Sequence, residues 1–172
     1  MNDDLKYIFT NVNDWLKFAE AKNAGLLALN VAATIGLLEV DKKLFDPLPS
    51  TYGILLIAFC VSSAICIYSI LPYLRWIKSH VKLGASDFST KKADLNVLFF
   101  GDISILKRDQ FIEMFKDKTS TAQLTPAEAD LVSQIIVNAE IASQKFAVFK
   151  ASCWITFLAT VLAVVLIFIH AV

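Results

Sequence analysis

Three long apolar blocks constrain the fold of this chain more than any other feature. They run over Ala24–Val40, Tyr52–Trp76 and Ala151–Ile169. A helix crosses the hydrocarbon core of a bilayer in about 20 residues. The third block carries no charge and the second carries none before Arg75, whereas the first contains Asn30 and ends beside Glu39. The sequence therefore predicts an all-helical membrane protein with three transmembrane helices.

The composition agrees with membrane spans rather than with an enlarged soluble core. Hydrophobic residues make up 56% of the 172 residues, whereas a soluble domain is usually about 45–50% apolar even when glycine is counted. The 16 basic and 16 acidic residues balance, so no overall field would attract a nucleic acid polymer. All three cysteines lie in the apolar blocks, where a thiol acts as a small apolar group rather than as part of a disulfide framework.

The sequence contains no recognisable set of catalytic residues. His80 and His170 are isolated from each other and from carboxylate clusters, and no nucleophile motif, metal-ligand spacing or dinucleotide fingerprint occurs. We therefore expect no enzymatic activity, no catalytic residue, and neither a metal site nor a cofactor.

Helical patterns extend the first and last spans beyond the apolar blocks. Apolar residues recur at helical spacing in Asp3–Lys22, and one helix should continue from there into the first span. The segment "TPAE" (125–128) combines a capping Thr, a Pro at the first helical position and a Glu that completes a capping box. No Gly or Pro follows before His170, so the last helix should be longer than the bilayer is thick and form a stalk with the first.

The chain is predicted to have three parts. They are 1–83, an N-terminal helix and transmembrane hairpin; 84–125, a small polar segment; and 126–172, the long helix that ends in the third span. We expect the second span to continue as helix to a left-handed cap at Gly84. In the polar segment we expect a loop over 84–94, a short strand or buried turn over 96–103, and an amphipathic helix over 106–118.

Lysine and arginine near the span ends predict the orientation. One side has Lys42 and Lys43. The other side has Lys17, Lys22, Arg75, Lys78, Lys82, Lys145 and Lys150. Because positive residues favour the cytoplasmic side, the helical stalk and the segment 84–125 are expected in the cytoplasm.

Two stripes along the first helix predict contacts with other helices. At 100° per residue, one stripe is polar and contains Asn13, Glu20, Asn23, Asn30 and Thr34. The second consists of small residues, Ala21, Gly25, Ala28, Ala32 and Gly36. Small residues at these spacings let helices approach closely in lipid, so both stripes are expected to face protein.

The last helix carries a matching polar face. It contains Gln134, Asn138, Lys145, Ser152 and Thr156. We expect Glu20 to pair with Lys145, or Lys22 with Glu140. Two interpretations of these side chains stay open: they hold helices together, or in an oligomer they become the wet lining of a pore or gate.

Basic residues of the middle region give a candidate ligand site. They are Arg75, Lys78, Lys82, Lys91, Lys92, Lys107 and Arg108. One interpretation is an anchor to lipid headgroups beside an aromatic belt. The other is contact with a small phosphorylated ligand, which needs only a few such groups. Phe99 and Phe100 are expected to fill space under the stalk, and Gly101 to permit the turn.

Two motifs resemble those of the Pycsar transmembrane effector family, bacterial membrane proteins encoded beside a pyrimidine nucleotide cyclase in antiphage defence. They are "NVNDWLKFAEAKNAGLLALNVAATIGL" (11–37) and "NVLFFGDI" (96–103). The matching residues are Phe18, Ala19, Lys22 and Asn23 in the first, and Phe99, Phe100 and Gly101 in the second. The order of spans and polar segments also matches over the whole chain.

The resemblance implies a function. The protein would sense cyclic CMP or cyclic UMP made after phage infection, impair the integrity of the bacterial inner membrane and cause abortive infection. Its partners would be membrane lipid, the cyclic nucleotide and further copies of itself in a homo-oligomer. Two alternatives stay open from the residues alone: a membrane-anchored scaffold that docks a cytoplasmic protein, and a constitutive small-ion channel.

Overall fold

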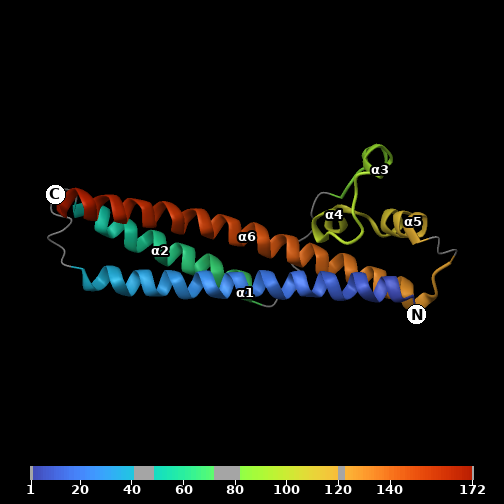
Figure 1. Ribbon diagram of the computed structural model, residues 1–172, viewed down its shortest axis with the longest axis horizontal. Helices are drawn as coiled ribbons and strands as arrows, with labels where there is room; N and C mark the ends of the chain where they lie inside the picture. The colour runs from blue at the N-terminus through green and yellow to red at the C-terminus, as the bar shows by residue number, and fades with distance from the viewer. Residues whose placement is uncertain (1, 41–48, 72–81, 120–122, 172) are drawn as a thin grey trace. The chain divides into compact units, whose positions relative to one another are not determined.

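The protein is helical in most of the residues that its computed structural model describes, which are 2–40, 49–71, 82–119 and 123–171. These ranges contain no strand. Their helices are α1 (Asp3–Glu39), α2 (Pro49–Ile70), α3 (Ala85–Lys91), α4 (Phe100–Ile105), α5 (Arg108–Thr119) and α6 (Pro126–Ala171) (Figure 1). α1, α2 and α6 are long and apolar enough to cross a membrane. The predicted all-helical fold with three spans is therefore confirmed.

Two compact units make up the fold. Unit 1 comprises Met1–Ala19 and Pro72–Lys145, and unit 2 comprises Glu20–Leu71 and Phe146–Val172. Each of the long helices α1 and α6 contributes residues to both units. The uninterrupted helix predicted at each end of the chain is thus present.

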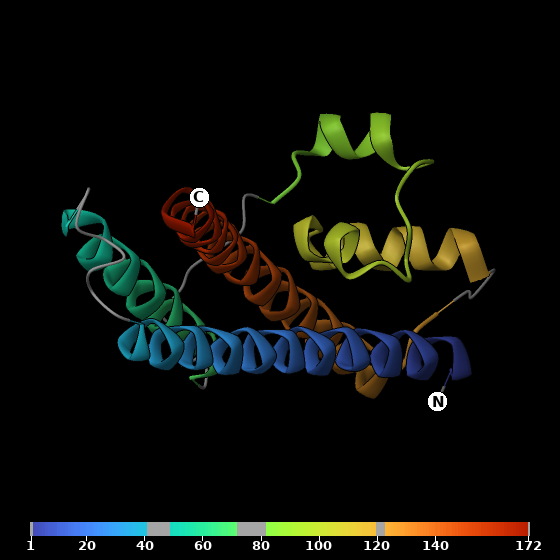
Figure 2. The ribbon, with the colours of Figure 1, turned by 60° about the vertical axis from the view of Figure 1, so that its left-hand side comes forward.

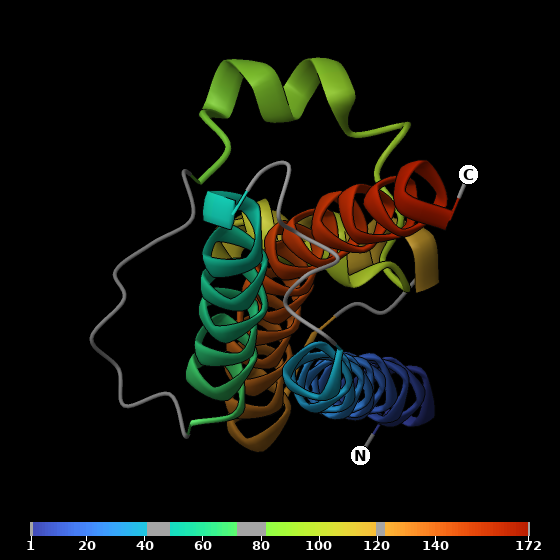
Figure 3. The same ribbon diagram turned by 90° about the vertical axis from the view of Figure 1, so that its left-hand side faces the viewer.

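Unit 2 is a bundle of the apolar parts of α1, α2 and α6, which Figure 3 shows nearly end-on. Its buried apolar cluster contains Leu37, Leu55, Phe59 and Ala159. Large apolar side chains also cover the outside of the bundle, among them Ile35, Ile57, Phe157 and Phe168. A soluble bundle keeps a polar outer face, so the apolar outside is suited to lipid.

Unit 1 has a core of its own, built from α5 and the polar parts of α1 and α6. Its fully buried apolar side chains include Leu5, Ile8, Val12, Phe111, Met114, Phe115, Val132 and Ile135. The short helices α3, α4 and α5 are seen in Figure 2. The amphipathic helix predicted over 106–118 is confirmed as α5, with Phe111, Met114 and Phe115 on its buried side.

The capping box predicted at the start of α6 is confirmed. The backbone N–H of Thr125 donates to Glu128 Oε2 at 2.9 Å, and the backbone N–H of Glu128 donates to Thr125 Oγ1 at 3.4 Å. The backbone N–H of Asn2 also donates to Glu128 Oε1 at 2.6 Å. These N–H donors, first that of Thr125 and then that of Asn2, lower the pKa of the Glu128 carboxyl, because they favour its charged form.

Two expectations for the middle of the chain are wrong, and a third is decided between its two alternatives. Residues 82–84 are not helical, and Gly84 precedes α3 with an extended backbone (φ −65°, ψ 158°) rather than forming a left-handed C-cap. The loop expected over 84–94 contains α3, whose Phe88 is buried. Of the two alternatives expected over 96–103, the strand is absent and a turn at 97–98 leads into α4.

Candidate functional site

Unit 2 buries a cluster of polar side chains inside its bundle. The cluster contains Asn30 of α1, Ser62 of α2, and Ser152 and Thr156 of α6, and each is at most 4% exposed. We call these four residues the polar cluster. Since they lie on the three membrane-crossing helices, water cannot satisfy them in hydrocarbon and they have to bond within the protein.

Hydrogen bonds connect the polar cluster across all three helices. Asn30 Nδ2 donates to Ser62 Oγ over 2.8 Å, and Thr156 Oγ1 donates to Asn30 Oδ1 over 2.7 Å. Ser62 Oγ donates to the backbone oxygen of Ser152 over 3.1 Å, and Ser152 Oγ donates to that of Ser62 over 3.0 Å. A hydroxyl reaches a neighbouring backbone only where helices approach closely, which small side chains permit.

Further groups extend the polar cluster along the helices. Cys66 Sγ is buried 3.1 Å from Ser152 Oγ. Thr34 Oγ1 donates to the backbone oxygen of Asn30, and Thr160 Oγ1 to that of Thr156, each over 2.8 Å. This bonding to the preceding turn satisfies a threonine hydroxyl within its own helix.

The two stripes predicted on α1 have different outcomes. Asn23 and Asn30 are fully buried, which confirms that these amides face protein, whereas Thr34 is half-buried and Glu20 is exposed. The expectation that the small-residue stripe faces protein is wrong within one chain, because its members are exposed: Ala21, Gly25, Ala28, Ala32 and Gly36. An amide left unbonded in lipid costs more than a small apolar side chain does, so the amides occupy the interface.

Lys22 lies at the start of the apolar part of α1. Its Nζ lies over the ring of Phe149 at 5.3 Å and over that of Phe146 at 5.9 Å. A cation over aromatic faces is stabilised by the ring quadrupole. Because Glu20 and Lys145 belong to different units, as do Lys22 and Glu140, the ion pairs suggested for them stay predictions.

Within unit 1, α1 and α6 are joined by amides. Asn138 Nδ2 donates to Asn13 Oδ1 over 2.7 Å. Lys145, seven residues further along the polar face of α6, is buried with 4% exposure. Polar residues of the predicted helix faces thus lie at helix contacts in unit 1 as well.

The predicted cation Lys82 connects the backbone at the end of α4 to a carboxylate of α6. Its Nζ donates to the backbone oxygens of Ser104 over 3.1 Å and Leu106 over 2.9 Å, and to the carboxylate of Glu140. An ammonium group has three N–H donors, and these acceptors use all of them. The hydrogen-bond donors of Lys82 are therefore used by acceptors at the end of α4 and on α6.

Lys92 forms ion pairs with α5. Its Nζ lies 2.5 Å from Asp117 Oδ2 and 2.6 Å from Glu113 Oε1. The hydrogen bond to Asp117, followed by that to Glu113, raises the pKa of Lys92. The side chains of Lys92, Asp117, Lys118, Ser89 and Met114 line an open cavity of about 380 Å³.

The remaining predicted cations are dispersed. Lys91 and Lys107 are exposed, and Arg108 Nη2 donates to the backbone oxygen of Ala129 in α6 over 3.1 Å. Arg75 and Lys78 lie outside the described residues. Lys82, Lys92 and Arg108 bond to different parts of unit 1, so these contacts do not bring the three cations together at one phosphate site.

Aromatic side chains from both sequence motifs converge in unit 1. The ring centroid of Trp15 lies 5.3 Å from that of Phe100 and 6.1 Å from that of Phe18, and Phe99 lies 4.9 Å from Phe100. Phe100 is buried as expected, but the expectation that Phe99 fills internal space is wrong, because Phe99 is 44% exposed. A Cβ at Gly101 would come within 2.6 Å of Phe99 Cε1, so Gly101 permits this ring to fold back over α4.

Sequence reasoning did not identify Ser62 or Trp15. The signal for Ser62 is the spacing of Ser62, Cys66 and Ser69, which places three small polar side chains on one face of α2. All three are buried. Among the described residues, no group of three His, Cys, Asp or Glu side chains is arranged to hold a metal ion.

Comparison with known proteins gives one family. The sequence model described as the Pycsar effector protein domain matches residues 4–171. Comparisons with curated proteins and with solved structures give no match.

Proposed function

Because the chain belongs to the Pycsar effector protein domain family, we propose that it is an antiphage effector that cyclic CMP or cyclic UMP activates. In this proposal the activated protein impairs the bacterial inner membrane and causes abortive infection. The positive-inside rule predicts that the polar unit 1 lies in the cytoplasm. In this proposal unit 1 receives the nucleotide there.

The polar cluster is the observation that carries the membrane step. Four hydrogen-bonding side chains from α1, α2 and α6 meet in the part of the chain that crosses lipid. When the helices pack together, these groups satisfy one another. When the helices move apart, the same groups favour water over hydrocarbon, so the separated state draws water into the membrane.

Impairment of the membrane requires more than one copy of the chain. The centre of the unit 2 bundle is filled by Leu37, Leu55, Phe59 and Ala159. A bundle filled in this way has no room for an aqueous path. We therefore propose a homo-oligomer in which helices of several copies rearrange and share the polar clusters.

The nucleotide acts by favouring the rearranged state. A shift from 1:99 to 99:1 requires a preference of about 5.5 kcal/mol for the favoured state. One hydrogen bond to a charged group is worth about 1.5–3 kcal/mol. Several contacts, or several subunits, have to contribute to activation.

The test is dye release from liposomes that contain the purified full chain. We expect release with cyclic CMP or cyclic UMP, and none with cyclic AMP or without nucleotide. Release without nucleotide would indicate a constitutive channel. If none of the nucleotides causes dye release and a protein partner co-purifies with the chain, the proposal is contradicted. That result would favour a membrane-anchored scaffold.

A further inference from the structure

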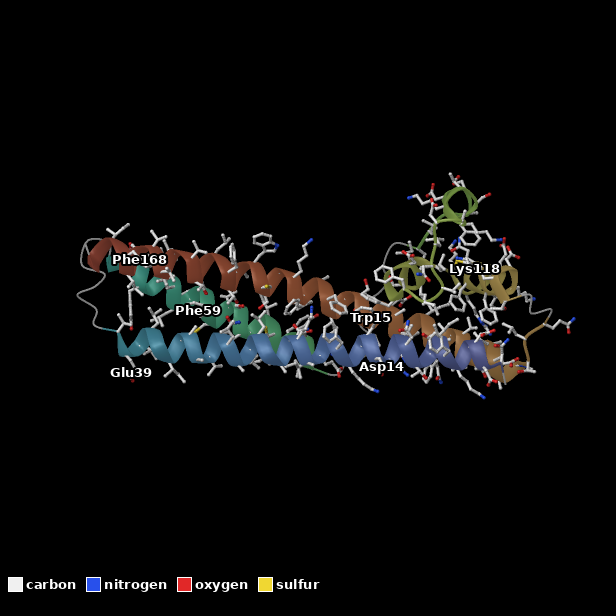
Figure 4. The ribbon with its side chains drawn as sticks, viewed as in Figure 1. Asp14, Trp15, Glu39, Phe59, Lys118 and Phe168 are labelled. Atoms are coloured by element: carbon white, nitrogen blue, oxygen red, sulfur yellow. The ribbon has the colours of Figure 1, made fainter. Side chains whose placement is uncertain are left out.

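A cavity on α1 lies at the aromatic side chains of unit 1. Asn11, Asp14, Trp15 and Phe18 line it, and its volume is about 250 Å³. Residues at these spacings occupy one face of a helix. The cavity combines aromatic rings with an amide and a carboxylate, and Figure 4 labels two of its residues, Asp14 and Trp15.

The aromatic wall of the cavity is held in place from behind. Trp15 is half-buried and packs against Phe100 at 5.3 Å, which is itself buried. Phe18 meets Trp15 edge to face at 6.1 Å and is 47% exposed. A ring supported from behind and open in front is the arrangement on which proteins stack nucleic acid bases.

The polar wall is oriented as well. Asn11 Nδ2 donates to the backbone oxygen of Leu98 over 2.6 Å, which fixes the direction of the amide. Asp14 Oδ1 lies 3.2 Å from Lys17 Nζ, and both side chains are more than half exposed. An acceptor-only carboxylate and a cation therefore stand beside the aromatic wall.

We propose that this cavity binds the base of the cyclic pyrimidine nucleotide and that Asp14 makes it prefer cytosine to uracil. The proposal rests on the proposed function and adds to it the site and the base. The ring stacks on Trp15, with Phe18 at its edge. Lys17 supplies positive charge for the cyclic phosphate.

The preference follows from the donors of the two bases. Cytosine carries an exocyclic amine, and a carboxylate accepts hydrogen bonds from that amine. Uracil has a carbonyl oxygen in the same position, which an ionised carboxylate repels because it has no proton to donate. The only ring N–H that uracil offers lies between two carbonyl oxygens, so its approach to Asp14 brings negative partial charges together.

The same aromatic residues have a second possible role at the membrane surface. Aromatic residues such as Trp and Tyr gather at bilayer interfaces, and Phe18 lies two residues before Glu20, where the part of α1 that belongs to unit 2 begins. A lipid contact needs no base selectivity. The two roles therefore differ in their dependence on nucleotide identity.

The experiment measures binding of cyclic CMP and cyclic UMP to the full chain in nanodiscs by calorimetry. The variants are Trp15→Leu and Asp14→Asn, with Tyr7→Leu and Asp4→Asn as controls, since Tyr7 and Asp4 are exposed residues of the same helix. We expect the wild type to bind cyclic CMP about tenfold more tightly or better. Trp15→Leu should weaken binding roughly 5- to 150-fold. Asp14→Asn should bring the two affinities close together, and the controls should match the wild type.

The outcomes separate the site from the function. If the wild type binds neither nucleotide, the proposed function fails. If the wild type binds but both variants keep its affinity and its ratio of affinities, the cavity is not the site and the inference fails. If Trp15→Leu weakens the contact with anionic lipid but leaves the nucleotide affinity unchanged, the aromatic residues form a lipid contact. That outcome also overturns the inference. Since Asp14 is a surface residue, its variant tests the ratio even if Trp15→Leu unfolds.

Discussion

At the scale of single residues, Asn30 decides how α1 packs in the membrane. It donates to Ser62 and accepts from Thr156, so one side chain joins three helices. Interhelical polar contacts in membrane proteins contribute about 0.6 kcal/mol on average, and up to about 1.7. We expect Asn30→Leu to lower the free energy of unfolding by about 1–3 kcal/mol, because it removes two such contacts and leaves their partners buried.

Unfolding by SDS in mixed micelles, followed by circular dichroism, measures this loss. Leu29→Ala is the control, since Leu29 is 56% exposed on the same helix turn. Equal stability of Asn30→Leu and the wild type would show that the polar cluster contributes nothing to packing.

Lys82 and Lys91 separate a structural cation from an exposed one. Lys82 bonds to Ser104, Leu106 and Glu140, whereas Lys91 is exposed. Because a hydrogen bond to a charged group contributes about 1.5–3 kcal/mol, we expect Lys82→Met to destabilise unit 1 by about 2 kcal/mol or more, and Lys91→Met to change stability little. Chemical denaturation checks both variants, and a stable Lys82→Met protein would remove the structural role.

At the scale of elements, the start of α6 depends on pH. Hydrogen bonds hold the pKa of Glu128 below its ordinary value, which is about 4.3 for a glutamate. The charged form is thus favoured in the folded state. Its contribution to stability is present above the ordinary pKa and is lost as the pH falls through the lowered value.

Hydrogen exchange of the first turns of α6 measures this dependence. We expect protection in the wild type to fall as the pH drops below the ordinary glutamate pKa of about 4.3 and passes through the lowered value. Glu128→Gln keeps a capping side chain but should flatten the pH profile, while Asp130→Asn, at an exposed position of the same helix, should keep the wild-type profile. Identical profiles for Glu128→Gln and the wild type would contradict the assignment.

The elements also show what the sequence can predict. α1, α2, α6 and the capping box follow from long apolar patterns and from Thr125 and Glu128, because these signals are local. α3 was missed because Phe88, its buried side chain, is a single apolar residue among polar ones. No helical period is visible in so short a segment.

The sequence also predicts some residues of the candidate sites and misses others. A polar stripe identifies Asn30 as a residue that needs a partner in lipid. It does not name Ser62, because a serine in an apolar helix bonds equally well to its own preceding turn. Trp15 and Phe100 come from distant parts of the chain, so only the packing of unit 1 brings them together.

At the scale of the whole molecule, the number of spans fixes the topology. α1, α2 and α6 are the helices of the described chain that are able to cross a membrane. An odd number of crossings places the start of α1 and the end of α6 on opposite sides. Since Lys and Arg gather near one set of span ends, the positive-inside rule predicts the N-terminus in the cytoplasm and the C-terminus outside.

Reporter fusions in bacteria test this topology. Alkaline phosphatase, which is active only outside the cytoplasm, should be active when it follows residue 172 and inactive when it precedes residue 3. Replacing Lys17 and Lys22 with Gln should weaken the preference, because both lie close to the first span and only nearby positive charges count. The reverse activities would place unit 1 outside, where a nucleotide made in the cytoplasm cannot reach it. The same data would then remove the proposed activation, because the sensing unit and its ligand would be separated by the membrane that the protein acts on.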